Sequence, residues 1–250
     1  NHARQRGRDS SGIVSLIEKS YDVRRADWDI RELVKRYPDV RSSVFFGHSR
    51  LITNGLSDNQ PVTRNGLILV HNGIVVNDEN VWDKTKLKRS LQIDSEIIIA
   101  MAEDYIEKGN DLTLLHEHIF SECKGVISCA LAVPAKGKLV LFSNNGSLYQ
   151  GSNQKNEIFF SSESYPLVEL GCRNVTQIIG QSIVLDIPTG IEKLASDDKS
   201  RVENLIPPFQ FIESEDRLLE FEKPDIKRCT RCILPETMPF IHFDEKAKTI

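Results

Sequence analysis

Three short segments of the chain hold residue types that can bind a free amino acid and stabilise a negatively charged oxygen. They are Gly47-His48-Ser49-Arg50, Val70-His71-Asn72-Gly73-Ile74 and Asp94-Ser95-Glu96. The planar guanidinium of Arg50 can pair with an α-carboxylate through two parallel hydrogen bonds. The carboxylate of Asp94 can accept hydrogen bonds from an α-ammonium group. We therefore expect these two side chains to hold the two ends of one amino acid.

Asn72 and Gly73 are the candidates for an oxyanion hole. The Asn72 side-chain amide and the Gly73 backbone N–H form a donor pair of the kind that holds the negative oxygen of a tetrahedral intermediate. Structural roles are open for all of these residues. Asn-Gly is also the common type I′ hairpin turn, Asp94 can be a helix cap, and Arg50 can pair with a nearby surface carboxylate. The turn and cap roles are compatible with ligand binding.

Hydrophobic periodicity predicts the elements that carry these residues. Apolar residues on both sides of Asn72-Gly73 predict a hairpin with these residues in its turn, and Asp94 precedes a helical apolar face that ends at Gly109. Further helices are predicted over residues 28–38 and 112–119. Strands are predicted over residues 12–17, 43–48, 126–133, 138–142, 158–161, 175–179 and 182–185. Helices enclosed by runs of antiparallel strands indicate an α+β fold with layered sheets.

The composition is that of an ordinary water-soluble chain. With 250 residues and 40% apolar content, it can bury one sizeable core plus a fragment of a second. A net charge of -4 and six scattered histidines favour neither nucleic acid nor an anionic membrane as a partner. The longest strongly apolar run, residues 97–102, is too short to cross a bilayer. We expect a cytoplasmic protein whose five cysteines are reduced.

Several motifs in the same order resemble the glutaminase domain of class II glutamine amidotransferases, a group that includes glucosamine phosphate synthase and asparagine synthetase. Besides the three segments above, they are Arg6-Gly7-Arg8-Asp9-Ser10-Ser11-Gly12, Asp58-Asn59-Gln60-Pro61 and Phe160-Ser161-Ser162-Glu163. The resemblance covers roughly residues 1–190. It implies the four-layer α-β-β-α sandwich of N-terminal nucleophile hydrolases, with L-glutamine as substrate and no cofactor.

The same resemblance assigns roles to single residues. It implies that Arg50, Thr53 and Asp94 bind the substrate, that Asn72 and Gly73 stabilise the oxyanion, and that Arg6 lies beside the nucleophile. The family's nucleophile is an N-terminal cysteine whose own α-amino group is the base, whereas the first residue here is Asn1. We expect a Met-Cys-Gly segment to precede Asn1 in the complete gene product. As written, the chain is expected not to hydrolyse glutamine, because mid-chain cysteines lack that amine.

A different pattern begins after residue 190. Residues 191–226 are charge-rich and are interpreted as a linker or docking arm. Residues 227–250, with Cys229-Thr230-Arg231-Cys232, resemble the opening of N-acetyl sugar amidotransferases, which use ATP in surface polysaccharide biosynthesis. This implies a synthetase domain that needs ATP and Mg²⁺, in cis or in trans. The cysteine pair can supply half of a zinc shell.

The resulting hypothesis is a glutaminase domain that supplies ammonia to an ATP-dependent amidotransferase acting on an N-acetyl sugar. Two alternatives remain open. The chain can be a non-catalytic, glutaminase-like docking or regulatory module, as Asn1 in first position suggests. It can also be an asparagine-synthetase-like enzyme, which Leu51 favours and the Cys229-x-x-Cys232 motif opposes.

Overall fold

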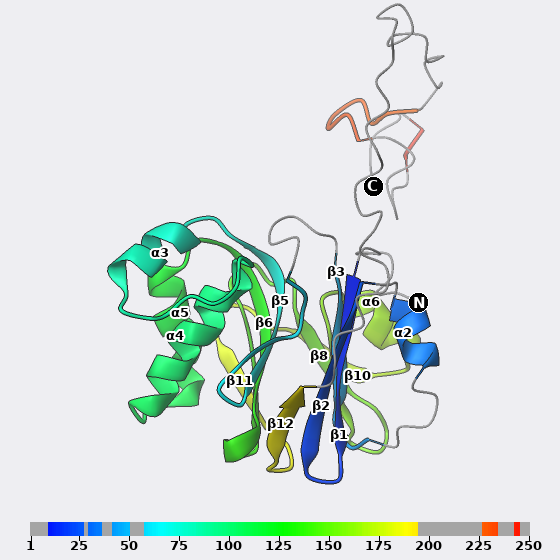
Figure 1. Cartoon of the computed structure of the whole chain (residues 1–250). Helices are drawn as coiled ribbons and strands as arrows, with labels where there is room; N and C mark the ends of the chain where they lie inside the picture. Colours follow the sequence, from blue (N-terminus) through cyan, green and yellow to red (C-terminus); the bar gives the residue numbers. More distant parts are fainter. Residues whose placement is uncertain are drawn as a thin grey trace, which may run out of the picture. The chain divides into compact units, whose positions relative to one another are not determined.

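The computed structural model describes residues 10–27, 30–36, 42–50, 58–194, 227–234 and 243–245. The chain divides into two compact units, residues 1–205 and residues 206–250. All helices and strands discussed below belong to the first unit (Figure 1).

The larger sheet of the first unit has five antiparallel strands in the order β11-β7-β6-β5-β4. Its inner strands carry apolar residues on both faces, so both faces must be covered. One face packs against helices α3, α4 and α5, which lie together on that side of the sheet (Figure 1). The strand bounds are β4 (Val62–Arg64), β5 (Leu67–Val75), β6 (Gly125–Val133), β7 (Lys138–Ser143) and β11 (Ser182–Asp186). The helix bounds are α3 (Asp78–Lys84), α4 (Ser95–Glu107) and α5 (Leu115–Glu122), the last preceded by a 3₁₀ turn at Leu112–Leu114.

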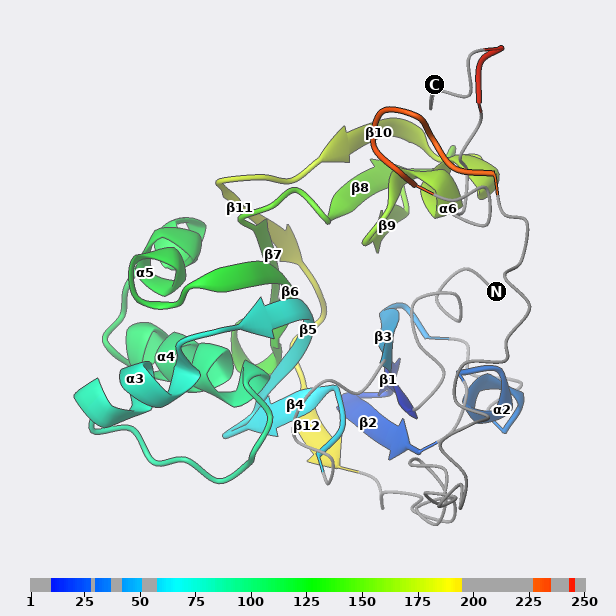
Figure 2. The same cartoon turned by 90° about the horizontal axis from the view of Figure 1, so that it is seen from above.

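A second, four-stranded sheet, in the order β12-β2-β1-β3, covers the other face of the large sheet. Its strands are β1 (Ser10–Ile17), β2 (Ser20–Ala26), β3 (Phe45–Arg50) and β12 (Ile191–Leu194). Apolar side chains of both sheets form one buried cluster between them. On the outer side, Leu33 of the short helix α2 (Ile30–Lys35) packs on Ile13 and Ala26 (Figure 2).

A third sheet has the order β10-β8-β9. It comprises β8 (Tyr149–Ser152), β9 (Ile158–Ser161) and β10 (Arg173–Gln177), and helix α6 (Ser164–Glu169) follows β9 directly. The Phe160 ring of β9 lies 6.1 Å, centroid to centroid, from the Phe46 ring of β3. Among the described residues, β3 and β9 are both edge strands, each paired on one side.

The predicted α+β class is confirmed, and most predicted strands and the helix after Asp94 are present within a few residues. The periodicity missed β2, β4, β8, β12, α3 and α6, which are short or mixed in polarity. Residues 144–146, between β7 and β8, form a bend, with Gly146 at φ +76°. Residues 28–29 and 37–41, which include Trp28 and Pro38, lie outside the described residues.

The hairpin predicted around Asn72-Gly73 is wrong. Strand β5 continues through both residues, with Asn72 opposite Ser128 and Gly73 opposite Ile127 in β6. Gly73 adopts φ +145°, and a Cβ atom there would lie 1.8 Å from the Val126 carbonyl oxygen. The glycine thus serves close approach of two strands rather than a turn, because the long partner strand β6 continues to pair on both sides of it.

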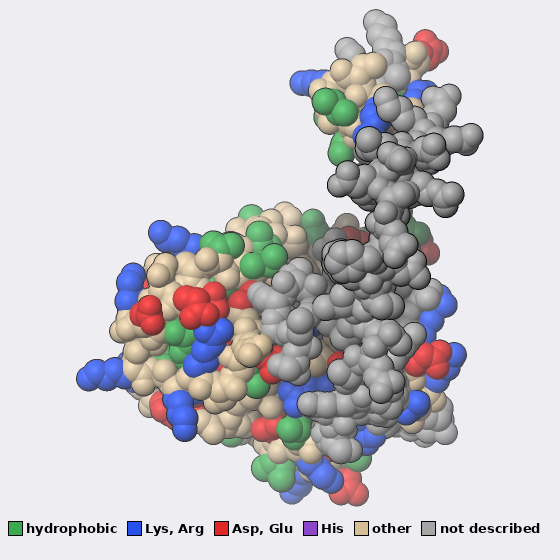
Figure 3. All heavy atoms as spheres, turned by 45° about the horizontal axis from the view of Figure 1, so that its top comes forward, with side chains coloured by type: hydrophobic (Ala, Val, Ile, Leu, Met, Phe, Trp, Pro, Cys, Tyr) green, Lys and Arg blue, Asp and Glu red, His purple; other side chains and the backbone are tan. Residues whose placement is uncertain are grey.

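The first unit continues beyond the predicted boundary at residue 190. Strand β12 (Ile191–Leu194) pairs in parallel with β2, with Ile191 opposite Ser20. In the second unit, the Lys227 ammonium lies 5.2 Å from the centre of the Phe243 ring. On the face shown in Figure 3, acidic and basic side chains are intermingled over the described surface. Within the described residues, no helix is long and apolar enough to cross a membrane.

Candidate functional site

Arg50 ends strand β3 with its side chain buried, at 4% exposure. Its Nη1 donates a hydrogen bond to the main-chain oxygen of Asp58. The Asp58 carboxylate accepts hydrogen bonds from the backbone N–H groups of Gln92, at 2.5 Å, and Ile93, at 3.0 Å. Asp58 therefore connects Arg50 to the residues that come directly before Asp94.

Asp94 stands at the N-cap position of α4, as predicted, but its side chain does not cap the helix. Its backbone is already helical, with φ -56° and ψ -30°, and its Oδ2 accepts a hydrogen bond from the Val75 N–H at 2.7 Å. The carboxylate is 5% exposed. Because Val75 ends β5, this bond attaches the start of α4 to the strand that carries Asn72 and Gly73.

His71 connects the same two elements from within β5. Its Nδ1 lies 2.9 Å from Ser95 Oγ, and its Nε2 lies 3.1 Å from the Val126 carbonyl oxygen. Since a carbonyl only accepts, Nε2 carries the proton and Nδ1 accepts from the serine hydroxyl. Burial lowers the pKa of His71, while the nearby Asp94 carboxylate acts in the opposite direction.

A cavity of about 430 Å³ lies in the first unit beside Asn72. Strand β3 contributes Gly47, His48 and Ser49, strand β5 contributes Val70 and Asn72, and residues of β6, β9, α6 and the loops next to β8 and α6 complete the lining. The Asn72 side-chain amide makes no hydrogen bond to the described residues. Among the predicted site residues that the structure describes, Asn72 lines this cavity, whereas Arg50, Gly73 and Asp94 do not.

His48 lines the cavity from the opposite sheet. Burial lowers its pKa to about 3, with smaller contributions from His71 and Arg50. Its Nδ1 is buried and has no hydrogen-bond partner among the described residues. The imidazole is therefore neutral at physiological pH, and a neutral ring beside Arg50 adds no repulsion toward that cation.

The thiols of the first unit are placed as structural residues. Cys123 and Cys129 are buried, and burial raises the pKa of Cys123 to about 12 and that of Cys129 well above its usual value. Cys172 is half-buried. A thiol with a raised pKa is a poor nucleophile because its thiolate is scarce.

The remaining predicted residues are placed as follows. Arg6 and Thr53 lie outside the described residues. In the second unit, Cys229 Sγ accepts hydrogen bonds from the backbone N–H groups of Arg231, at 3.3 Å, and Cys232, at 3.4 Å. Within the described residues, no cluster of three or more metal-binding side chains is present.

Sequence reasoning missed the part played by Asp58 and Gln60. The Gln60 side chain donates from Nε2 to the His71 carbonyl at 2.8 Å and accepts the His71 N–H at Oε1, at 2.7 Å. Asp58-Asn59-Gln60-Pro61 was predicted only as part of a family motif. Clustered polar residues directly before a strand were the available signal, but their partners are 8 to 35 residues away in sequence.

The segments that carry this site are similar in sequence to known glutamine amidotransferase domains. Residues 48–169 match the protein-family model described as a glutamine amidotransferase domain. The chain is 25% identical over 200 residues to glutamine–fructose-6-phosphate aminotransferase (isomerizing) of Chlamydia trachomatis, an alignment covering 75% of this chain and 32% of the relative. It is 25% identical over 198 residues to amidophosphoribosyltransferase of Pasteurella multocida, covering 69% and 39%. The chain thus spans less than two fifths of the length of either relative.

Solved structures agree at the level of the fold. The glutamine phosphoribosylpyrophosphate amidotransferase of B. subtilis, complexed with ADP and GMP, has a TM-score of 0.58 at 20% identity, over 74% of this chain and 43% of that chain. A structure described as the allosteric regulatory enzyme of purine biosynthesis has a TM-score of 0.57 at 18% identity, over the same shares.

Residues 48–169 of the chain are therefore similar to a glutamine amidotransferase domain. The matched range contains Arg50, Asn72, Gly73 and Asp94. It does not contain Arg6 or the cysteine pair of the second unit.

Proposed function

We propose that this domain hydrolyses L-glutamine and supplies the ammonia to a synthetase. The observation that carries the proposal is the connection of Arg50 and the start of α4 through Asp58. It connects a buried cation to the residues directly before a buried carboxylate, which suits the two charged ends of an amino acid. Asn72, with its unbonded amide on the neighbouring strand, then stabilises the oxyanion together with the Gly73 N–H.

The attacking thiol in this proposal belongs to an N-terminal cysteine, as the resemblance to N-terminal nucleophile enzymes implies. The raised pKa values of Cys123 and Cys129 argue against either of them as the nucleophile. The edge strands β3 and β9 both line the cavity, so an extended segment entering there can pair with either edge. It would lie beside Asn72, within the four-layer sandwich of N-terminal nucleophile hydrolases that we propose for this unit.

The acceptor of the ammonia is proposed to be an N-acetyl sugar of surface polysaccharide biosynthesis. The support comes from residues 227–250, whose Cys229-Thr230-Arg231-Cys232 segment resembles the opening of ATP-dependent sugar amidotransferases. ATP and Mg²⁺ would act in that synthetase domain. Cys229 and Cys232, at the Cys-x-x-Cys spacing, would supply half of a zinc site.

The test is glutamine hydrolysis and glutamine binding by the full-length protein. Arg50→Ala is expected to weaken binding of L-glutamine at least about 100-fold by calorimetry, because a bidentate charged contact is lost. Arg173→Ala, which removes an exposed arginine from β10, is the matched control. Unchanged affinity in Arg50→Ala would disprove the proposed clamp, meaning Arg50 and Asp94 as the residues that bind the two ends of glutamine. Absence of glutamine hydrolysis in the wild type would disprove the proposed function.

An electrophilic glutamine analogue locates the nucleophile. A diazo ketone analogue of glutamine is expected to alkylate the N-terminal cysteine, as mapped by peptide mass spectrometry. Labelling of Cys129 instead would show that a buried thiol becomes reactive and would contradict this part of the proposal.

A further inference from the structure

Residues 58–60 contact every element that carries a residue of the proposed site. Asp58 binds Arg50 of β3 and the backbone before α4. Gln60 binds the backbone of β5 at His71, directly before Asn72. Asn59 donates from Nδ2 to the Ala26 carbonyl at 3.0 Å and to the Ser11 carbonyl at 3.4 Å, in the four-stranded sheet. One segment thus joins both sheets and the start of α4.

We propose that Asp58 and Gln60 are positioning residues of the glutamine site, with separate tasks. Asp58 sets the distance between Arg50 and Asp94, and Gln60 sets the position of Asn72 and Gly73. This inference rests on the proposed glutaminase function.

The task of Asp58 follows from its two kinds of bond. Its main-chain oxygen receives the Arg50 guanidinium, while its carboxylate receives the N–H groups of Gln92 and Ile93. One residue therefore binds both Arg50 and the two residues directly before Asp94. A change in the side chain releases the segment before Asp94 and leaves the main-chain acceptor of Arg50 in place.

The task of Gln60 follows from the register of β5. Strand β4 pairs with β5 only at residues 62–64, opposite residues 67–69. Because the two strands are antiparallel, the first residue of β4, Val62, lies opposite Leu69, and the pairing does not extend to His71. The Gln60 amide takes over at this position and satisfies both the N–H and the carbonyl of His71. Gln60 is 5% exposed and His71 is 1% exposed, so water cannot replace these bonds without an opening of the site.

The position of Asn72 depends on this bond pair. His71 holds Ser95 on one side and the Val126 carbonyl on the other, and the next two residues are Asn72 and Gly73. An oxyanion donor acts by being fixed in place before the reaction, so a small shift of the strand lowers the rate of the chemical step. Loss of the Gln60 amide therefore affects catalysis more than substrate binding.

Steady-state kinetics of glutamine hydrolysis by the full-length protein separates the two tasks. Asp58→Ala is expected to raise KM for L-glutamine about tenfold or more, with a smaller effect on kcat, since it loosens binding of the substrate ends. Gln60→Ala is expected to lower kcat about tenfold or more, with a smaller effect on KM, since it loosens the oxyanion donors. Asp58→Asn keeps an acceptor oxygen and is expected to recover part of the loss.

Two variants serve as controls for the loss of similar hydrogen bonds elsewhere. Asn77 binds the Lys124 N–H at 2.7 Å and the Glu122 carbonyl at 2.9 Å, the same donor and acceptor pattern as Gln60. Asp111 accepts the Thr113 N–H at 2.9 Å, as Asp58 accepts those before α4. Asn77→Ala and Asp111→Ala are expected to lower the melting temperature without changing KM or kcat more than about twofold.

The outcomes distinguish this inference from the function on which it rests. Wild-type kinetics in Asp58→Ala and Gln60→Ala, with Arg50→Ala impaired, would overturn the inference and leave the proposed function standing. The inference would also be overturned if both variants changed KM and kcat by similar factors. The same holds if the control variants Asn77→Ala and Asp111→Ala changed KM and kcat as much as these two variants do. No hydrolysis of glutamine by the wild type would overturn both the inference and the proposed function.

If Gln60→Ala does not fold, Gln60→Glu decides the task of Gln60, because it keeps the side-chain volume but loses the donor. The comparison of Asp58→Ala with Asp58→Asn decides the task of Asp58 independently.

Discussion

Gly73 shows how the backbone around a single residue determines which side chain can stand there. Its φ of +145° and the Val126 carbonyl oxygen 1.8 Å from a built Cβ leave no room for a side chain. The Val126 carbonyl cannot move away easily, because His71 Nε2 also donates to it. Glycine here allows close contact of β5 and β6 and puts the proposed oxyanion donor in a strand rather than in a turn.

We predict that Gly73→Ala destabilises the protein by about 2 kcal/mol or more in urea unfolding, through strain and a steric clash. Gly109→Ala is the control, because Gly109 also has a positive φ, +77°, but a Cβ there meets nothing within 4 Å. Its expected cost is about 1 kcal/mol, from the backbone conformation alone. Equal losses in the two variants would contradict the clash.

The thiols give a second prediction at the level of single residues. Iodoacetamide at pH 8 is expected to modify exposed Cys232 much faster than buried Cys123 and Cys129. The raised pKa values of the two buried thiols leave little thiolate at that pH. Mass spectrometry of the modified peptides measures the order, and early modification of Cys129 in the folded protein would contradict the assigned burial.

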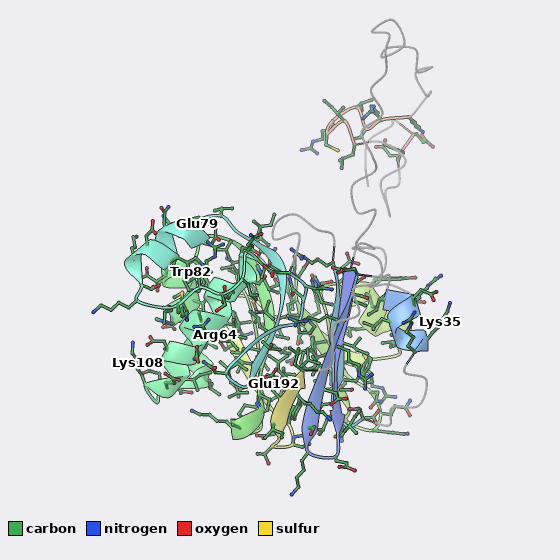
Figure 4. All side chains as sticks on the ribbon, in the orientation of Figure 1. Lys35, Arg64, Glu79, Trp82, Lys108 and Glu192 are labelled. Carbon is green, nitrogen blue, oxygen red and sulfur yellow. The ribbon has the colours of Figure 1, made fainter. Side chains whose placement is uncertain are left out.

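At the scale of elements, α4 is held in place by a buried acid in its first turn. Glu96 accepts the N–H groups of Ser90, at 2.9 Å, and Leu91, at 2.7 Å, and lies 3.2 Å from the Arg64 guanidinium. Arg64, which Figure 4 labels, also pairs with Glu103, about two turns further along the same face of the helix, at 2.5 Å. This network fixes residues 90–91, which come directly before the two residues that Asp58 binds.

We predict that Glu96→Ala lowers the free energy of unfolding by about 3 kcal/mol, because it leaves Arg64 and two backbone N–H groups without this carboxylate. Glu107→Ala, at an exposed position near the end of the same helix, is expected to change it by less than about 0.5 kcal/mol. Chemical denaturation measures both variants. A similar, small effect of the two substitutions would show that the network contributes little to stability.

At the scale of the whole molecule, the two packed sheets each contribute one histidine that is neutral in the folded state, the half-buried His48 and the buried His71. His48 belongs to β3 and His71 to β5. Burial lowers the pKa of both rings, because it disfavours the protonated, charged form. The pKa of His48 in the folded state, about 3, lies below the value of about 6.5 for an unfolded chain. The unfolded state therefore binds this proton first as the pH falls.

We predict that the contribution of these neutral histidines to the free energy of unfolding is fully present above about pH 6.5. Below that pH it decreases by about 1.4 kcal/mol per pH unit for each histidine that the unfolded chain protonates first. The loss attributable to His48 continues until the pH approaches its folded pKa of about 3. Urea unfolding between pH 7 and pH 4 measures the slope, and His48→Gln is expected to reduce it by about one proton. An unchanged slope in that variant would contradict the lowered pKa of His48 in the folded state.

Local patterns were enough to predict the α+β class, the long strands and the helix after Asp94. An apolar strand such as β6 or an apolar helix face is recorded in neighbouring residues, whose spacing reveals which side faces a core. The three chemical segments were recognisable for the same reason, since each is a run of four or five residues. The residue types of Arg50, Asn72 and Asp94 could be read directly.

Local patterns could not show what holds these segments together. Asn72-Gly73 has the sequence of a turn, yet pairing with β6, more than 50 residues later, keeps it extended. Asp94 has the sequence of a cap, yet Val75 takes its carboxylate. Asp58 and Gln60 acquire their partners only when β3, β5 and the start of α4 meet. Hydrogen bonds between distant residues leave no periodic trace in a chain, because they depend on how the sheets pack against each other.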